Sequence, residues 1–151
     1  MINTGGILLY RFNEDVPEVF LVHPGGPFWA KKDEGAWSIP KGELDEGENP
    51  LTGAKREFTE ETGSTVDGNF ITLKPVKSSN KMIHVFALEH YLDVTTVTSN
   101  LFSMEWPPKS GKMNEFPEVD RGAWFDFEDA LIKINKFQVP ILQELRDKLL
   151  K

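Results

Sequence analysis

Three glutamates, Glu57, Glu60 and Glu61, recur at helical spacing in the segment Pro50–Thr62. Residues three and four positions apart share one side of an α-helix, so these carboxylates are expected to lie close together. Their like charges repel, and they lie near the helix C-terminus, where negative charge is disfavoured. A divalent cation would offset both costs, because Mg²⁺ takes oxygen ligands from carboxylates and substrate phosphates. Exposed glutamates are also common on helices, so these three residues alone do not decide between a metal site and an acidic surface.

The helix that would carry these carboxylates has well-marked ends. Asn49 is a favoured N-cap, Pro50 suits the first helical position, and Gly63 suits the position just after the last turn. The pattern therefore predicts a helix over Pro50–Thr62. Its apolar stripe is expected to face the core, with the carboxylates on the opposite face; the stripe consists of Leu51, Ala54, Phe58 and Thr62.

The longer stretch around this helix resembles the Nudix box of the Nudix hydrolase superfamily. That motif reads Gly, five residues, Glu, seven residues, Arg-Glu, a bulky apolar residue, any residue, Glu-Glu, any residue, Gly and an apolar residue. Ser64 departs from the last position, which concerns packing and not the metal ligands. So many fixed spacings make the motif specific; the matching residues are Gly42, Glu48, Arg56, Glu57, Phe58, Glu60, Glu61 and Gly63.

The resemblance extends from about Gly5 to the last helix, through the segment Trp37-Ser-Ile-Pro-Lys-Gly42 and the Trp124-Phe125 pair. It implies the family's α/β/α sandwich, of the α+β class, with a mixed β-sheet in one domain over residues 1–151. It also implies that the box binds one to three Mg²⁺ ions, which Mn²⁺ can replace. Carried over by position, the metal ligands are Glu57, Glu60, Glu61, Glu118 and the carbonyl of Gly42.

Two of these assignments involve a choice. Many similar proteins add a carboxylate from a loop after the box, and Glu118, six residues before Trp124, is preferred to Glu115 for this role. Arg56 is expected to orient the carboxylates, with Glu48 as its partner, although a pair like this can also be an ordinary surface salt bridge.

The chemistry expected of such a site is hydrolysis of a diphosphate linkage. Phosphoryl transfer needs positioning and charge neutralisation more than covalent catalysis, and divalent ions neutralise charge on the leaving group. Glu61 or Glu118 is expected to accept the proton of the attacking water, and the sequence does not choose between them. Glu60 and Arg56 complete the predicted catalytic set.

Substrate contacts are expected from cations and aromatic rings in the loops. Lys41 precedes the box glycine and is a candidate phosphate contact. Lys109 and Lys112 flank Ser110-Gly111, where backbone amides could approach an anion. Stacking on a base is assigned to Trp29 or its neighbour Phe28, with Trp106 as an alternative, whereas Trp37 is expected in the core. The three histidines show no ligand spacing and are interpreted as incidental.

The substrate class stays open at this point. The segment before the box resembles dinucleoside polyphosphate hydrolases, but the tyrosine that this branch often carries is absent, since Ser79, Asn80 and Lys81 stand there. Dinucleoside polyphosphates or nucleoside triphosphates are favoured, and nucleoside diphosphate sugars or ADP-ribose come second. A nucleotide-binding regulator without catalysis is a third possibility, although the box keeps every carboxylate.

The remaining elements must position these residues. Strands are expected at Gly5–Arg11 and Glu18–His23, forming a hairpin, and also at Phe70–Val76, Met82–Tyr91 and Gly122–Phe125. Asp126 is expected to cap a helix that ends near Ile134, and a last helix is expected over Asn135–Lys151, with Pro140 near its start. The segment Thr95–Phe116 is expected to be an irregular loop.

Composition sets outer bounds on function. The 151 residues carry a net charge of −7, which disfavours nucleic acid as a partner. Cysteine is absent, so disulfides and thiolate sites are excluded, and the cytoplasm is the expected location. No apolar run approaches a membrane span, and the first ten residues resemble a strand more than a signal peptide. A small nucleotide is therefore the expected partner of a monomer or homodimer.

Overall fold

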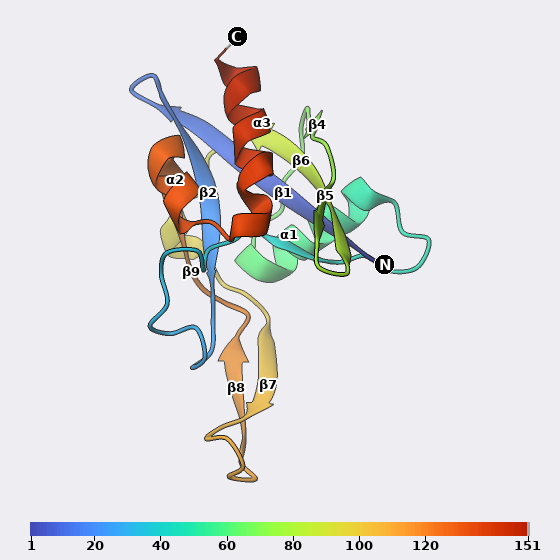
Figure 1. Ribbon diagram of the computed structural model, residues 1–151, viewed down its shortest axis with the longest axis vertical. Helices are drawn as coiled ribbons and strands as arrows, with labels where there is room; N and C mark the ends of the chain where they lie inside the picture. Colours follow the sequence, from blue (N-terminus) through green and yellow to red (C-terminus); the bar gives the residue numbers. More distant parts are fainter. Residues whose placement is uncertain (151) are drawn as a thin grey trace.

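The computed structural model describes residues 1–150 and is built around one mixed β-sheet (Figure 1). Its strand order is β4–β6–β1–β2–β9, with β3 and β5 added beside β1 and β6. β1 and β6 run parallel, and the other pairs are antiparallel. The strands are β1 (Ile2–Asn13), β2 (Val16–Pro24), β3 (Lys41–Glu43), β4 (Ile71–Thr72), β5 (Val76–Ser78), β6 (Lys81–Glu89) and β9 (Val119–Asp126).

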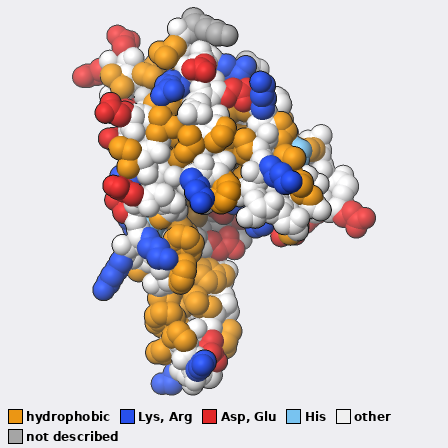
Figure 2. Space-filling model, viewed as in Figure 1, with side chains coloured by type: hydrophobic (Ala, Val, Ile, Leu, Met, Phe, Trp, Pro, Cys, Tyr) orange, Lys and Arg blue, Asp and Glu red, His pale blue; other side chains and the backbone are white. Residues whose placement is uncertain are grey.

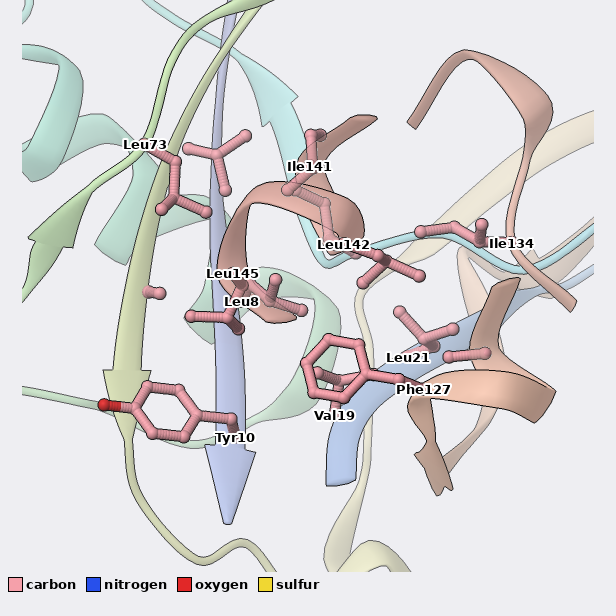
Figure 3. Packing of buried hydrophobic residues seen from close by; sticks show 14 of the residues in the cluster. Leu8, Tyr10, Val19, Leu21, Leu73, Phe127, Ile134, Ile141, Leu142 and Leu145 are labelled. Atoms are coloured by element: carbon pink, nitrogen blue, oxygen red, sulfur yellow. The ribbon is translucent and has the colours of Figure 1, made fainter. Parts of the chain in front are cut away.

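Helices cover both faces of this sheet. Successive side chains of a strand point to opposite faces, and in β1 this sends Leu8 toward α2 (Phe127–Lys133) and α3 (Val139–Leu149). Ile7 and Leu9 point the other way, toward α1 (Pro50–Thr62). The close view in Figure 3 shows the α3 side chains packed over β1 and β2. The predicted α/β/α sandwich is confirmed.

Most elements lie where the sequence places them. The β1–β2 hairpin and the bounds of α1 are confirmed. The segment Phe70–Val76, expected as one strand, instead contains β4 and the first residue of β5, because the chain leaves the sheet between them. The last helix begins only at Val139, after a 3-10 turn over Lys136–Gln138, and Lys151 lies outside the described residues.

The expectation of an irregular loop over Thr95–Phe116 is wrong. This segment contains β7 (Leu101–Glu105) and most of β8 (Met113–Pro117), which pair as an antiparallel hairpin. The hairpin projects away from the sheet (Figure 1), and hydrophobic side chains cover much of its visible surface (Figure 2). Phe102 lies opposite Phe116, with their ring centroids 6.1 Å apart, so a cross-strand aromatic pair stabilises it.

Among residues 1–150, no helix is both long enough and apolar enough to cross a bilayer.

Replacing Leu142 tests the α3 face of the sandwich. Leu142 is fully buried (Figure 3), so Leu142→Ala should lower the free energy of unfolding by about 2–5 kcal/mol. Leu150, just after the same helix, is 71% exposed, and Leu150→Ala is the matched control with little expected effect. Urea unfolding measures both, and equal losses would contradict this packing.

Candidate active site

Helix α1 carries the carboxylates and packs very closely on β1. The side chain of Asn49 accepts hydrogen bonds from the amides of Leu51 and Thr52, and Gly63 ends the helix in the left-handed conformation. On β1, a Cβ added to Gly5 would lie 3.1 Å from the backbone of Pro50 and of Ala54. A glycine leaves room for this close approach of helix and strand, so both the caps of α1 and this contact help to position the helix.

Arg56 gathers the acidic side chains of the box. Its Nε and Nη2 donate to both carboxylate oxygens of Glu48 at 3.1 and 2.9 Å, and its Nη1 donates to Glu57 at 2.9 Å. The same Nη1 reaches Glu60 at 3.3 Å. The bidentate contact lowers the pKa of Glu48 to about 2 and confirms the predicted Glu48–Arg56 contact. One guanidinium thereby holds the loop before the helix and two candidate metal ligands.

Glu61 lies deeper than the other box glutamates. Its Oε1 accepts a hydrogen bond from the backbone amide of Lys41 at 3.2 Å. Burial raises the pKa of Glu61 to about 8 despite that bond and the Lys41 charge, and the nearby carboxylates of Glu118 and Glu57 add to the rise. A buried carboxylate with a raised pKa beside other carboxylates is a group that a cation would stabilise.

Glu57 lies directly against the glycine that opens the box. A Cβ added to Gly42 would lie 1.8 Å from Oε2 of Glu57, so any larger residue at this position would displace the carboxylate. Burial, followed by the charge of Glu60, raises the pKa of Glu57. The predicted ligands Gly42 and Glu57 are therefore neighbours.

The expectation that the carboxylates lie opposite the apolar stripe is wrong. Glu61 follows Ala54 by seven residues, which is almost two full turns, so the two residues lie on the same side of α1. The side chain of Glu57 is only 12% exposed. These two carboxylates lie at the border of the core, which explains their raised pKa values.

Glu118 is brought to this border by the junction of β8 and β9. Its amide donates to the carbonyl of Asn100, and its carbonyl accepts from the amide of Gly25, both at 2.9 Å. Glu118 and Glu61 line the same small cavity, of about 150 Å³, together with Lys41. Burial and the charge of Glu60 raise the pKa of Glu118. Glu115 is exposed on the β7–β8 hairpin, so the geometry supports the choice of Glu118 over Glu115.

A metal ion would have to rearrange this cluster slightly. Among residues 1–150, no three Asp, Glu or His side chains are already gathered in a position to hold an ion. Nη1 of Arg56 instead contacts Glu57 and Glu60 at once. The donor set nevertheless fits a hard divalent cation, because it offers several carboxylates whose charges have too few partners.

Two predicted substrate contacts lie elsewhere. Lys109 and Lys112 are exposed in the turn of the β7–β8 hairpin, outside both cavities beside the carboxylates. The amides of Lys109 and Gly111 already donate to the carboxylate of Glu105, at 2.8 and 3.2 Å, so the glycine serves an internal turn. The geometry therefore lends these two lysines no support as substrate contacts, and their role stays a prediction.

Lys41 and Trp29 do lie beside the carboxylates. Both line a larger cavity of about 420 Å³, which shares Pro24, Ser38 and Lys41 with the smaller one. Lys81 and Phe137, which no sequence pattern indicated, line the same cavity from β6 and from the turn before α3. Burial lowers the pKa of Lys41, and the charge of Lys81 adds to this effect, whereas Glu61 opposes it. No sequence pattern indicates that Lys41, Lys81 and Phe137 lie together, because only the tertiary fold brings them to one cavity.

His23 is also more than an incidental residue. It is fully buried, with Nδ1 2.9 Å from a carboxylate oxygen of Asp120 and Nε2 2.6 Å from the carbonyl of Lys32. The ring therefore joins the loop that carries Trp29 to β9, two residues after Glu118. A polar residue at an inward position of a predicted strand is the signal that could have revealed it.

The comparison with known proteins agrees with this geometry. The family model described as the NUDIX domain matches residues 3–145. The chain belongs to the Nudix family. Nudix hydrolase 7 of Arabidopsis thaliana is 27% identical over 117 residues, which cover 72% of this chain and 39% of that protein. The chain thus spans about two fifths of the length of this Nudix relative.

Solved structures share the fold at low sequence identity. A Caenorhabditis elegans Ap4A hydrolase in a binary complex has a TM-score of 0.65 and 20% identity, with 99% of this chain and 98% of that chain covered. The NUDIX domain of Shewanella oneidensis NrtR, complexed with ADP ribose, has a TM-score of 0.68 and 16% identity, with 99% and 88% covered. These likenesses show the Nudix fold of the chain.

Glu61→Gln should change the stability of the metal-free protein. Folding raises the pKa of Glu61 from 4.5 to about 8, so the folded state binds more protons between these values and the free energy of unfolding falls as pH rises through them. Glu61→Gln should flatten this fall and reduce the Mg²⁺-induced rise in Tm. Thermal unfolding from about pH 5 to pH 8, with chelator or Mg²⁺, measures both effects.

The control for this experiment is Glu34→Gln, which removes an exposed carboxylate in the same way. It should keep the wild-type pH slope and the wild-type response to Mg²⁺. If Glu61→Gln behaved like Glu34→Gln, the pH dependence of stability would not come from a raised pKa at Glu61.

Proposed function

We propose that this protein is a Mg²⁺-dependent hydrolase that cleaves a diphosphate linkage in a nucleoside diphosphate derivative. The observation that carries the proposal is the small cavity where Glu61 and Glu118 meet Lys41, next to the other box glutamates. Family membership and the relative named Nudix hydrolase 7 support an enzyme that acts on acid anhydrides of phosphorus. Mn²⁺ is expected to substitute for Mg²⁺, because both accept carboxylate oxygen ligands.

Each residue of the site has a role in this proposal. Glu57, Glu60 and Glu61, with Glu118 and the Gly42 carbonyl, would hold the cation, which neutralises charge on the phosphates when bound. Arg56 would orient Glu57 and Glu60 through Nη1, while Glu48 holds the other end of its guanidinium group.

The attacking water needs a proton acceptor in the same cavity. Glu61 and Glu118 are the two carboxylates that line it, and the raised pKa of each brings it closer to neutral pH, which suits a general base. Glu61 is the deeper of the two and is fixed by the amide of Lys41, so it is the less free to move toward a substrate. Both remain candidates for the base.

The favoured substrates are dinucleoside polyphosphates or nucleoside triphosphates. The fold shared with an Ap4A hydrolase is consistent with this choice. ADP-ribose or a nucleoside diphosphate sugar is the second candidate, since a NUDIX domain of similar fold was solved with ADP ribose. The cytoplasm remains the proposed location.

Glu118→Gln tests the loop carboxylate against its neighbour Glu115. Loss of the charge beside Glu61 should reduce turnover of a diphosphate substrate by at least about 100-fold, the scale of a lost general base or metal ligand. Glu115→Gln makes the same change on the exposed hairpin and should keep wild-type turnover. Steady-state kinetics with Mg²⁺ measures both variants, and equal activities would remove Glu118 from the site.

Glu60→Gln separates an enzyme from a nucleotide-binding regulator. An enzyme should lose most of its turnover and still bind nucleotide weakly, whereas a regulator has no turnover to lose. Separation of the products formed in ¹⁸O-water, followed by mass spectrometry of each product, identifies the phosphorus that is attacked. Absence of any turnover by the wild-type protein, across nucleotide substrates with Mg²⁺ and Mn²⁺, would contradict the hydrolase assignment.

A further inference from the structure

The larger cavity beside the carboxylates differs in charge from the rest of the protein. The chain carries a net charge of −7, yet the lining of this cavity includes Lys41 and Lys81 and no acidic residue. Within residues 1–150, neither lysine forms a side-chain salt bridge. Glu61 and Glu57 act on the charge of Lys41 from outside this cavity, but no carboxylate lies between the two lysines within it. An anion bound between the two lysines would offset the repulsion between their like charges.

The two lysines lie on separate strands, and they mark a path that leads from the carboxylates into the larger cavity. Lys41 opens β3 and is shared with the small cavity that Glu61 and Glu118 line. Lys81 begins β6 beside the turn at Ser79 and lines only the larger cavity. A ligand that reaches from the carboxylates past Lys41 to Lys81 therefore needs anionic groups along its length.

Aromatic rings complete the larger cavity. Trp29 belongs to the loop after β2, and Phe137 belongs to the turn before α3, where it remains 40% exposed. Exposed aromatic rings provide surfaces on which a nucleobase stacks. The cavity volume of about 420 Å³ lies in the range typical of small-ligand sites.

We propose that this cavity binds a nucleoside together with the phosphates that join it to the cleaved linkage, and that Lys81 selects for phosphate chain length. The proposal rests on the proposed hydrolysis at the carboxylates and extends it to the substrate class. The base stacks on Trp29 or Phe137, and Lys41 and Lys81 bind successive phosphates.

A charge count favours a long chain over a short one. A diphosphate diester carries two negative charges, and both are used at the carboxylate-bound cation and Lys41. Lys81 is exposed and then keeps water as its partner, whereas a third or fourth phosphate would add a charge-assisted contact to it. The cavity thus fits dinucleoside polyphosphates with three or more phosphates better than ADP-ribose or nucleoside diphosphate sugars.

Diadenosine compounds with two, three and four phosphates test this directly, because only the chain length changes. Lys81→Gln should reduce the preference for four phosphates over two, measured as a ratio of kcat/KM, by about tenfold, which corresponds to one charge-assisted contact. The loss should appear mainly in KM, because Lys81 lies outside the cavity that holds Glu61 and Glu118. Lys77→Gln, the control, removes an exposed lysine of the neighbouring strand β5 and should keep the wild-type ratio.

Equilibrium binding gives a second readout that does not depend on turnover. Inorganic tripolyphosphate should bind more weakly to Lys81→Gln than to Lys77→Gln, whereas pyrophosphate should bind the two equally. Phe137→Leu should weaken binding of the diadenosine compounds and leave tripolyphosphate unaffected. Phe12→Leu, at a ring that is 47% exposed and outside this cavity, is its control.

The outcomes separate this inference from the proposed hydrolysis. If the wild-type protein cleaves these compounds but Lys81→Gln and Lys77→Gln show the same chain-length ratios and the same tripolyphosphate affinity, the inference is wrong and the hydrolase stands. If the wild-type protein cleaves none of them but cleaves another nucleoside diphosphate derivative, the inference is wrong and the hydrolase stands. If it cleaves no nucleotide substrate at all, the hydrolase assignment fails, and the binding measurements still decide whether the cavity selects polyphosphates.

Discussion

The site depends on one guanidinium that holds several carboxylates on a helix where they would otherwise repel one another. Arg56 contacts Glu48 with two nitrogens and shares a third between Glu57 and Glu60. A lysine could not replace it, because an ammonium lacks the planar fork that makes several bonds in fixed directions. The contact with Glu48 also joins the acidic loop to the helix, so the arrangement of the ligands and the path of the chain before α1 depend on the same side chain.

Glycines make this arrangement possible by allowing close contacts. Gly53 lies inside α1, where glycine costs roughly 0.5–1 kcal/mol relative to alanine. A Cβ there would lie 2.3 Å from Leu44 and 2.7 Å from Oε1 of Glu48, so the helix gives up intrinsic stability to keep Glu48 in place. Gly42, on strand β3, likewise leaves room for the carboxylate of Glu57. Local helix stability is thus traded for the positions of the acidic groups.

The sequence predicted what local chemistry determines and missed what the tertiary fold assembles. The ends of α1 followed from Asn49, Pro50 and Gly63, and the mixed sheet between helices followed from the family resemblance. The β7–β8 hairpin was missed because its short strands are separated by a Pro-, Ser- and Gly-containing turn that masks their alternation. Lys81 and Phe137 were missed because they are 56 residues apart in the chain and meet only across the sheet edge.

The charges of the two cavities explain how an acidic protein can bind a polyanion. Carboxylates line the small cavity, so a phosphate enters there only with a cation that reverses the local sign. The larger cavity has lysines and no carboxylates, so a phosphate could approach it without a bridging cation. Lys41 lines both cavities and therefore lies where the acidic cavity meets the basic one. A nucleoside triphosphate spanning both would therefore be fixed in direction, because exchanging its ends would place an uncharged nucleoside at the carboxylates. A symmetric dinucleoside polyphosphate presents the same groups in either direction.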